Sequence, residues 1–451
     1  MAGRSPAGHL HDDRWPLARI AAAVAATAAL SACAPGPQSS GSQGQEPESV
    51  STDLGDGEIE LTLYDGAGLK TIDEALIAAF EEKHPNVSVE TRFDPDDVQA
   101  QNAPRVLASD DPPDIARINA LADIVGNGQL TNLDKYADLY GWDSLPEGQL
   151  AMYRVSDEGV RGSGSQYTVA SGFVLTGLYY NKELAEELGV GDPPATVAEL
   201  EEDLAAAAAA GVTPILAGNQ TGQVVLPVQS MVNNAMGPQP VNDWVFNVPG
   251  ATIDTPEALE AVELVSSWAE QGYFNDDTNG TDGTAALGRF TRGESLFFFS
   301  GSWDASTLQD QMGESVGFVL APVGEDGAQP LGMSDPVSNF GIPANADEKD
   351  AAAAFLDFLL SPEARQIVVD SGAAPSGTGE PPATAEGTLK AEVQARFAEL
   401  VEADGQVQFV QNATSGINAE WLAQTQELVE GRVSPADYLA EIQATYEAEL
   451  R

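Results

Sequence analysis

Residues 58–93 read EIELTLYDGAGLKTIDEALIAAFEEKHPNVSVETRF, and this stretch decides the fold class. Apolar and polar residues alternate over 58–64 and again over 87–93, which is the period-two pattern of a β-strand. Between these runs, apolar residues recur at helical spacing, with Thr71 and Glu74 at the spacing of a capping box. A strand, a helix and a second strand in this order predict a β-α-β unit and a sheet with parallel strands.

Helix and strand signals continue to alternate along the rest of the chain. Caps, helical spacing and alternation predict a helix capped by Asn181, a helix from Thr196 through 205–210 with a capping box to Glu199, a strand at 212–216, a helix from Thr255, a helix over 350–370 and helices over much of 386–451. We therefore predict an α/β fold with mixed, mostly parallel sheets and additional carboxyl-terminal helices.

The composition excludes several partners and chemistries. The 451-residue chain is 43% hydrophobic, which is enough for substantial cores, and 20 Lys plus Arg stand against 70 Asp plus Glu, a formal charge of −50. This acidity argues against nucleic acid and anionic lipid as binding partners, because clustered cations recognise both. With three histidines and one cysteine in the chain, neither a His–Cys zinc site nor a serine-hydrolase triad is expected.

The amino terminus has the pattern of an export signal. An apolar run at 20–30 follows two arginines and is shorter than the roughly 20 residues that span a membrane. It ends in Leu30-Ser31-Ala32-Cys33, which resembles the bacterial lipobox, in which the cysteine is lipidated after cleavage just before it. We predict a signal peptide over 1–32, a lipidated Cys33, and a flexible tether over 33–57. An unmodified cysteine is the alternative.

Four ordered segments share the pattern of one known family. They are FEEKHPNV (80–87) with PDI (113–115), GLYYNKEL (177–184) with PPAT (193–196), FTRGES (290–295) with GSW (301–303), and GIP (341–343) with AAFLDFL (353–359) and SPEA (361–364). By their order, spacing and coverage of nearly the whole mature chain, the sequence resembles the family 1 extracellular solute-binding proteins, the group that includes maltose-binding protein.

The resemblance implies a two-lobe fold of the periplasmic-binding-protein type, with crossover strands as a hinge that closes around the ligand. We place lobe one at 58–172 plus 335–372 and lobe two at 173–334 plus 373–451. The implied role is that of a lipoprotein, anchored on the outer face of the cell membrane, that delivers a small solute to the permease subunits of an ABC-type importer. A sugar or sugar derivative is the expected solute. We expect a monomer with no enzymatic activity, metal or cofactor.

Trp303 is the first candidate for binding a sugar. Sugar sites combine flat aromatic side chains, on which C–H groups stack, with carboxylates and amides that bond hydroxyls. Trp303 follows the apolar run 296–299 and a short Ser-Gly-Ser loop, so we expect it at the carboxyl edge of a buried strand, where open α/β sheets bind ligands. The resemblance implies that it stacks on sugar; packing against the next helix is the alternative. Asp304 is expected either to accept hydroxyls or to cap that helix.

Other aromatic and acidic positions add candidates. Trp421 lies in the carboxyl-terminal helices, where the resemblance implies a second stacking aromatic. Trp244 lies in a turn-like segment, and Tyr167 precedes the first crossover and is expected to line the cleft. Asp65 ends the first strand and is expected to point its carboxylate at the same sheet edge, unless it bonds its own turn.

The segment 116–119, Ala-Arg-Ile-Asn, departs from the family pattern, because relatives often carry aromatic residues and carboxylates there. Arg117 and Asn119 are therefore added as candidate ligand contacts. Arg117 either pairs with a nearby carboxylate or binds an anionic group on the solute, so a neutral and an anionic solute both stay open.

The loop 275–286 partly matches a calcium loop, but its twelfth position is Ala286 rather than Glu. We interpret it as a polar loop and predict no metal site.

Two other functions fit the same sequence features. A secreted carbohydrate-active enzyme would use two of the many carboxylates, and a surface sensor or adhesin would use the same fold for another purpose. The matched segments cover the chain without an added catalytic module, which favours binding over catalysis.

Overall fold

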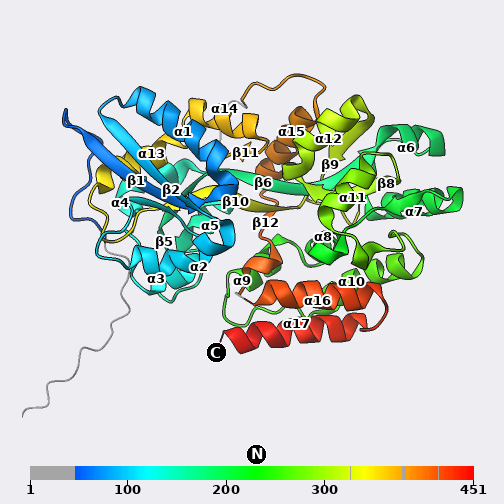
Figure 1. The fold of residues 1–451 in the computed structure, drawn as a ribbon. Helices are drawn as coiled ribbons and strands as arrows, with labels where there is room; N and C mark the ends of the chain where they lie inside the picture. Colours follow the sequence, from blue (N-terminus) through cyan, green and yellow to red (C-terminus); the bar gives the residue numbers. More distant parts are fainter. Residues whose placement is uncertain (1–45, 326, 378–381, 415, 451) are drawn as a thin grey trace, which may run out of the picture. The chain divides into compact units, whose positions relative to one another are not determined.

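The computed structural model describes residues 46–325, 327–377, 382–414 and 416–450 (Figure 1). The predicted signal peptide and Cys33 lie outside these residues. Residues 46–57 form no helix or strand but contact the folded part: the Lys135 ammonium donates to the Pro47 carbonyl over 2.8 Å, and Val50 and Leu54 pack against a hydrophobic core. This end of the predicted flexible tether is therefore held by contacts.

Strands and helices alternate along the described residues. The strands are β1 (Ile59–Gly66), β2 (Val87–Asp94), β3 (Ile115–Arg117), β4 (Arg154–Val155), β5 (Ser165–Gln166), β6 (Thr168–Asn181), β7 (Thr213–Ile215), β8 (Ser295–Gly301), β9 (Val316–Val319), β10 (Gly332–Gly341), β11 (Ala374–Pro375) and β12 (Gln406–Val407). The α-helices are α1 (Lys70–Lys83), α2 (Asp96–Leu107), α3 (Leu121–Gly126), α4 (Asp134–Tyr140), α5 (Glu147–Tyr153), α6 (Lys182–Leu188), α7 (Val197–Ala210), α8 (Val225–Met236), α9 (Pro238–Val245), α10 (Pro256–Glu270), α11 (Gly283–Phe290), α12 (Ala305–Met312), α13 (Lys349–Phe358), α14 (Pro362–Ser371), α15 (Leu389–Glu402), α16 (Ile417–Val429) and α17 (Pro435–Glu449). Short 3-10 turns are η1 (Ala67–Leu69), η2 (Trp142–Ser144), η3 (Asn219–Thr221), η4 (Thr278–Gly280), η5 (Ser302–Asp304), η6 (Gly313–Ser315) and η7 (Val410–Asn412). Within the described residues, no helix combines the length and apolarity that crossing a bilayer requires.

The predicted β-α-β unit is confirmed: β1 pairs in parallel with β2, with Ile59 opposite Val87, and α1 connects them. The predicted capping box of α1 is wrong. Leu69 is the N-cap residue, no side chain caps the helix, and Thr71 already lies inside it. The reason is that the turn η1 leads directly into α1, so the helix begins before Thr71.

Two long strands, β6 and β10, run through the middle of the sheet, whose strand order is β2-β1-β3-β10-β6-β8-β7. The first part of β6 pairs antiparallel with β10, and its last part pairs antiparallel with β8 and β9. Parallel pairs lie toward the two ends of this order, where β1 pairs with β2 and β3, and β7 pairs with β8. The sheet is mixed as predicted, but its centre is antiparallel rather than mostly parallel, because β6 runs opposite to both of its neighbours.

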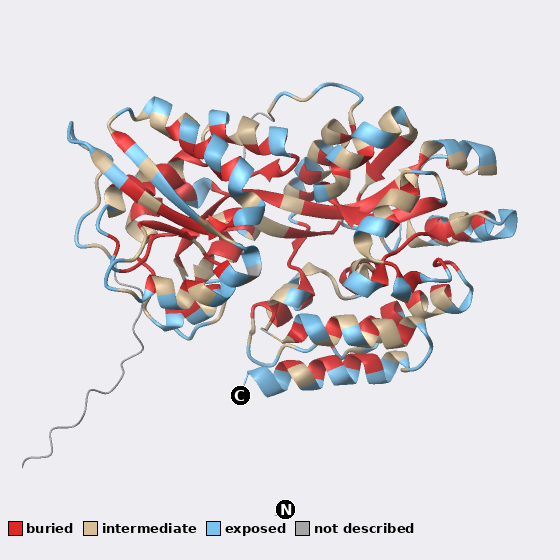
Figure 2. Cartoon of the chain, viewed as in Figure 1, coloured by how far each residue is buried: buried red, intermediate tan, exposed pale blue. Residues whose placement is uncertain are grey.

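The side chains of β6 contribute to two large hydrophobic cores. Tyr179 belongs to the first core and Leu178 to the second, because neighbouring side chains of a strand point to opposite faces. Figure 2 shows that β6 and β8 are buried along nearly all of their lengths. The first core also packs Phe80 of α1 edge-on against Phe355 of α13, with 5.2 Å between the ring centroids. The second includes α16 and α17, which lie side by side (Figure 1).

Most predicted helix starts are confirmed by their hydrogen bonds. Thr196 and Glu199 form the complete capping box of α7, Asn181 caps α6, and Thr255 caps α10. The predicted helix over 350–370 is two helices, α13 and α14. The break precedes Pro362, where Ser361 accepts the Ala364 amide as a new N-cap.

Candidate ligand-binding site

Trp303 is held at the end of a buried strand. It lies in the turn η5 directly after β8, and it is 49% exposed, the only aromatic among the exposed large hydrophobic residues of the described chain. Two hydrogen bonds fix the turn to β6: the Tyr179 hydroxyl donates to the Gly301 carbonyl (2.8 Å), and the Leu175 amide donates to the Ser302 hydroxyl (3.2 Å). The indole lies so close to Gly301 that a Cβ there would overlap it. The sheet therefore presents an aromatic surface to solvent.

Asp304 is half-buried beside this ring. The Ser300 hydroxyl donates to its Oδ2 over 2.5 Å, and the side chain does not cap α12. Burial raises the pKa of Asp304 above its ordinary value, while hydrogen bonds from Ser300 and Trp303 oppose the rise. Of the two roles expected for this residue, helix capping is therefore absent, and its carboxyl lines a pocket.

Trp303 forms part of two pockets. The first, which we call the polar pocket, has a volume of about 780 Å³ and is lined by Thr221, Gly222, Gln223, Leu226, Asp282, Gly283, Thr284, Ala285, Leu287, Ser300, Trp303, Asp304, Phe409 and Gln411. The Phe409 ring lies near the indole, with 6.5 Å between the centroids and 42° between the planes. The polar pocket thus combines two aromatic rings with carboxylates, amides and hydroxyls, and these are the kinds of group that bind sugars.

The side chains of the polar pocket differ in whether their hydrogen-bonding groups already bond the protein. Gln223 is fixed, because its amide donates to the Phe299 carbonyl (2.9 Å) and its oxygen accepts the Gly218 amide (2.8 Å). The side chains of Thr284 and Gln411 form no hydrogen bond within the described residues. These two groups are free to bond a solute.

The second pocket, which we call the apolar pocket, has a volume of about 630 Å³ and is lined by Gly68, Leu69, Thr71, Ile72, Ala75, Val174, Ser302, Trp303, Val337, Ile367, Asp370, Ser371, Gly372 and Ala373. Its walls come from η1, α1, β6, β10 and α14. No Lys, Arg or His lines either pocket, whereas three aspartates do. An anionic solute would find no cationic partner in them.

Arg117 ends β3 and Asn119 follows it, and both side chains bond neighbouring residues. The Arg117 guanidinium is 3.4 Å from Asp65 Oδ1 and 3.0 Å from Asp96 Oδ1, so it pairs with nearby carboxylates. The Asn119 amide donates to Gln99 over 2.8 Å. Neither residue lines the polar or the apolar pocket. The structure therefore agrees with the pairing interpretation of Arg117.

Asp65 lines neither pocket but is fully buried near Asp73 of α1. Its Oδ1 accepts the amide of the next residue, Gly66, so the alternative that Asp65 bonds its own turn is confirmed. The Asp65 carboxyl lies close enough to Asp73 to disfavour its ionisation, and the Ser338 hydroxyl of β10 donates to Asp73 Oδ1 over 2.7 Å. Burial and the neighbouring Asp65 raise the pKa of Asp73 to about 9. The burial of Asp65 follows from packing, because α1 covers the end of the strand.

Three predicted aromatic contacts are core residues. Trp244 and Trp421 are 0% exposed and lie edge to face, and Trp244 also stacks on Tyr446 with 4.5 Å between centroids. Tyr167 is 3% exposed in a smaller core with Tyr64. Their assignment to the binding surface is corrected, because packing of the carboxyl-terminal helices and of β6 places these rings inside.

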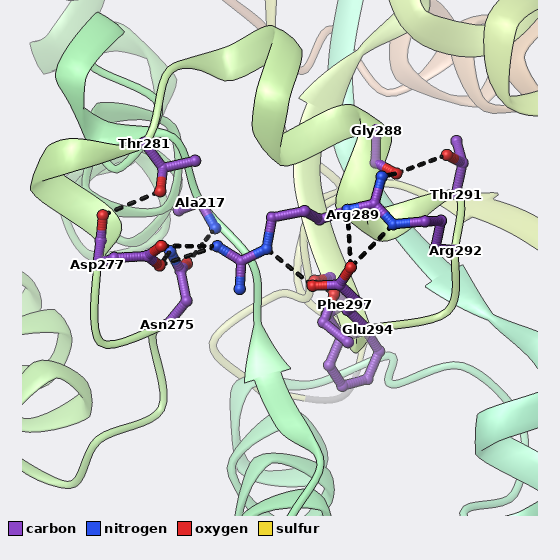
Figure 3. Close-up of polar contacts among 11 residues, drawn as sticks. Ala217, Asn275, Asp277, Thr281, Gly288, Arg289, Thr291, Arg292, Glu294 and Phe297 are labelled. Carbon is purple, nitrogen blue, oxygen red and sulfur yellow. Dashed lines mark hydrogen bonds and ion pairs between the residues drawn. The ribbon is translucent and has the colours of Figure 1, made fainter.

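In the possible calcium loop, Asp277 is paired with Arg289 of α11, which lies beyond the loop (Figure 3). The Arg289 guanidinium lies 2.8 Å from Asp277 Oδ1, and the Asn275 amide donates to the same oxygen over 2.8 Å. Arg289 also bonds Glu294, which pairs with Arg292. Within the described residues, no group of three or more His, Cys, Asp or Glu side chains is arranged to hold a metal ion. The polar-loop interpretation fits this geometry.

Several residues of the two pockets could not have been found from the sequence. Phe409 and Gln411 reach the polar pocket from η7 and the residue before it, and Thr221 and Gln223 reach it from η3 and the residues after it, although more than 180 residues separate these segments. None of them belongs to a motif, so no local signal marks them. Of the pocket residues, Trp303 is the one whose position the sequence predicted, from the apolar run that precedes it.

Comparison with known proteins identifies the family. A model of the bacterial extracellular solute-binding protein family matches residues 66–366. A protein of Brucella abortus (strain 2308) named as a binding protein is 25% identical over 315 residues, which are 68% of this chain and 73% of the relative.

Solved structures share the fold. The apo form of RafE from Streptococcus pneumoniae has a TM-score of 0.71 at 20% identity and covers 88% of this chain and 100% of its own. The bacterial solute receptor AcbH, described as having an exclusive preference for β-D-galactopyranose, has a TM-score of 0.72 at 16% identity and covers 88% of this chain and 99% of its own. These likenesses establish the two-lobe solute-binding fold. Because the family model spans well over half of the sequence, the chain belongs to the bacterial extracellular solute-binding protein family.

Proposed function

We propose that this chain captures a carbohydrate or carbohydrate derivative against Trp303 and delivers it to the permease subunits of an ABC-type importer. The observation that carries the proposal is the exposed indole of Trp303, held by β6 and β8 between two pockets, with the Asp304 carboxyl beside it. An aromatic surface next to planar polar groups suits the apolar face and the hydroxyls of a sugar.

The fold and the charge of the pockets support this choice. RafE has been solved in complex with raffinose, and another structure with the same fold, TM-score 0.68, is a chitin oligosaccharide binding protein. The residues that line the two pockets include no cation, and Arg117 is engaged by Asp65 and Asp96. A solute without negative charge fits this site better than a sugar acid does.

Importer delivery and membrane anchoring complete the proposal. The matched family consists of binding proteins rather than enzymes, and its description places them outside the cell. The lipobox-like Leu30-Ser31-Ala32-Cys33 supports attachment to the outer face of the membrane, where a captured solute is passed to the permeases. We propose that the protein acts there as a monomer whose two lobes, 58–172 plus 335–372 and 173–334 plus 373–451, close on the solute.

The test is to remove the indole and measure both binding and stability. Trp303→Ala is expected to weaken binding of the sugar found in a calorimetric screen by about tenfold to a hundredfold, ~1.4 to 2.8 kcal/mol, because it removes both stacking and apolar contact. Its melting temperature without ligand is expected to stay near that of the wild type, because truncating a buried tryptophan would cost about 3–5 kcal/mol and this ring is half exposed.

Leu450→Ala is the matched control, because Leu450 is 48% exposed and lines neither pocket. It should leave affinity unchanged. Trp303→Phe, which keeps a ring, should retain more affinity than Trp303→Ala. Unchanged affinity of Trp303→Ala together with a large drop in melting temperature would refute the proposed role of this residue.

A further inference from the structure

The two pockets that share Trp303 differ in chemistry. In the polar pocket, hydroxyl, amide and carboxyl side chains come from η3, α11, β8, η5 and η7. In the apolar pocket, the walls are largely aliphatic: Leu69 comes from η1, Ile72 and Ala75 from α1, Val174 and Val337 from the long strands, and Ile367 from α14. One solute that touches both sides of Trp303 would therefore meet two different environments.

Within the part of the chain that the structure describes, three polar side chains of the apolar pocket already bond the protein, which leaves the Thr71 hydroxyl and the second Asp370 oxygen for a solute. The Ser302 hydroxyl accepts the Leu175 amide (3.2 Å), the Ser371 hydroxyl donates to the Val368 carbonyl (2.6 Å), and Asp370 Oδ1 accepts the Gln366 amide (3.1 Å). A sugar ring buried there would leave several hydroxyls without partners, and each unpaired hydroxyl opposes binding. An apolar group buried in the same pocket has no hydroxyls to leave unpaired, so this free-energy cost is absent.

We infer that the solute is amphipathic: a sugar that bears an aryl or alkyl substituent, with the sugar in the polar pocket and the substituent in the apolar pocket. This inference rests on the proposed function and specifies the class of carbohydrate. The volumes permit this arrangement, because about 780 and 630 Å³ each lie in the range of pockets that bury a drug-sized ligand, so a sugar fits in one and an aryl or alkyl group in the other. Trp303 lines both pockets and contacts both halves of the solute.

The experiment compares glycosides that differ only in the substituent. Methyl, n-hexyl and phenyl β-glycosides of glucose, galactose, xylose and N-acetylglucosamine are titrated into the full chain by calorimetry, with tryptophan fluorescence as a second readout. The change in fluorescence on binding is expected to come mainly from Trp303, because Trp142, Trp244, Trp268 and Trp421 are at most 2% exposed and cannot contact the solute, and Trp15 lies in the predicted signal peptide. For the sugar that binds, the phenyl and hexyl glycosides are expected to bind at least tenfold more tightly than the methyl glycoside.

Two substitutions on α1 assign this gain to the apolar pocket. Ala75 is exposed and lines the pocket, whereas Ala78 is exposed on the same helix and does not. Ala75→Asp should remove the phenyl-over-methyl preference. Ala78→Asp, which changes the net charge equally, should leave both affinities unchanged. Ala75→Leu should reduce the preference by filling the pocket without a charge, and equal melting temperatures establish that all three variants fold.

The possible results separate this inference from the proposed function. Equal binding of the methyl and phenyl glycosides, with loss of both in Trp303→Ala, would overturn the amphipathic solute and retain the sugar site. A disaccharide that binds tenfold more tightly than the phenyl glycoside of its first sugar would assign the apolar pocket to a second sugar ring and also overturn the inference. If no glycoside binds, the carbohydrate proposal itself fails, and the inference fails with it.

Discussion

At the scale of single residues, the carboxyl pair Asp65–Asp73 is expected to make stability depend on pH. Burial and the neighbouring Asp65 raise the pKa of Asp73 to about 9 in the folded protein, from 3.8 in an unperturbed side chain. Between these values the folded state holds a proton that the unfolded state has lost, so the free energy of unfolding falls as pH rises through this window. Its slope approaches about 1.4 kcal/mol per pH unit for one proton.

Asp73→Asn is expected to flatten this decline between pH 6 and pH 9, because the amide donates to Asp65 without a titratable proton. Denaturant unfolding at a series of pH values measures the slope. Asp310→Asn is the control, because Asp310 is exposed and its substitution changes the net charge equally. Equal slopes for Asp73→Asn and the wild type would contradict the raised pKa of Asp73 in the folded protein.

At the scale of elements, two capping boxes suggested by the sequence differ in the structure, and they provide a matched test. Thr196 accepts the Glu199 amide over 3.3 Å, and Glu199 accepts the Thr196 amide over 3.0 Å, whereas Thr71 lies inside α1 and caps nothing. Thr196→Ala is expected to lower the free energy of unfolding by about 0.5–2 kcal/mol, because it leaves a helix amide without its partner.

Thr71→Ala is expected to leave stability unchanged or slightly raised, because alanine favours the interior of a helix more than threonine does. Chemical denaturation of both variants beside the wild type measures the two changes. Equal losses for the two threonines would mean that α1 begins at Thr71 after all, in contradiction to its N-cap at Leu69.

At the scale of the whole molecule, we expect the solute to close the two lobes about a hinge in the long strands. β6 and β10 pair with each other and connect otherwise separate groups of strands, so a bend in them would move one group toward the other. Small-angle scattering should show a smaller radius of gyration with saturating ligand, because closure encloses the solute. Trp303→Ala should show a smaller change at the same ligand concentration, because its weaker binding leaves fewer molecules occupied. An unchanged radius for the wild type would exclude hinge closure while leaving binding intact.

Anchoring of the whole molecule is expected to depend on Cys33. Metabolic labelling with a fatty-acid analogue should tag the wild-type chain in its host, because the lipobox-like segment directs lipidation of the thiol. Cys33→Ala should carry no label and should be released from the membrane fraction. Ser40→Ala, a change in the predicted tether, should keep the label. Equal labelling of wild type and Cys33→Ala would contradict the predicted anchor.

The sequence by itself determined the features that arise from neighbouring residues. Alternation and helical spacing over residues 58–93 determined the β-α-β unit, and the caps at Asn181, Thr196 and Thr255 determined where three helices begin. The exposed position of Trp303 was also predictable, because a buried apolar run followed by glycine places the next side chain at a strand's end. These signals act over a few residues, where backbone hydrogen bonds and strand geometry are local.

Only the tertiary structure decided which of the other candidates face a pocket. Trp244 and Trp421 resemble Trp303 in type, but long-range helix packing buries them, and Asp65 is covered by α1 and paired with Asp73. The same packing brings Phe409 and Gln411 beside Gln223 in the polar pocket, although no motif marks any of them. Whether a side chain is buried depends on which distant segments pack against it. Those contacts form when the apolar surface of the whole chain packs together, so residue type and local spacing do not predict the burial of a single position.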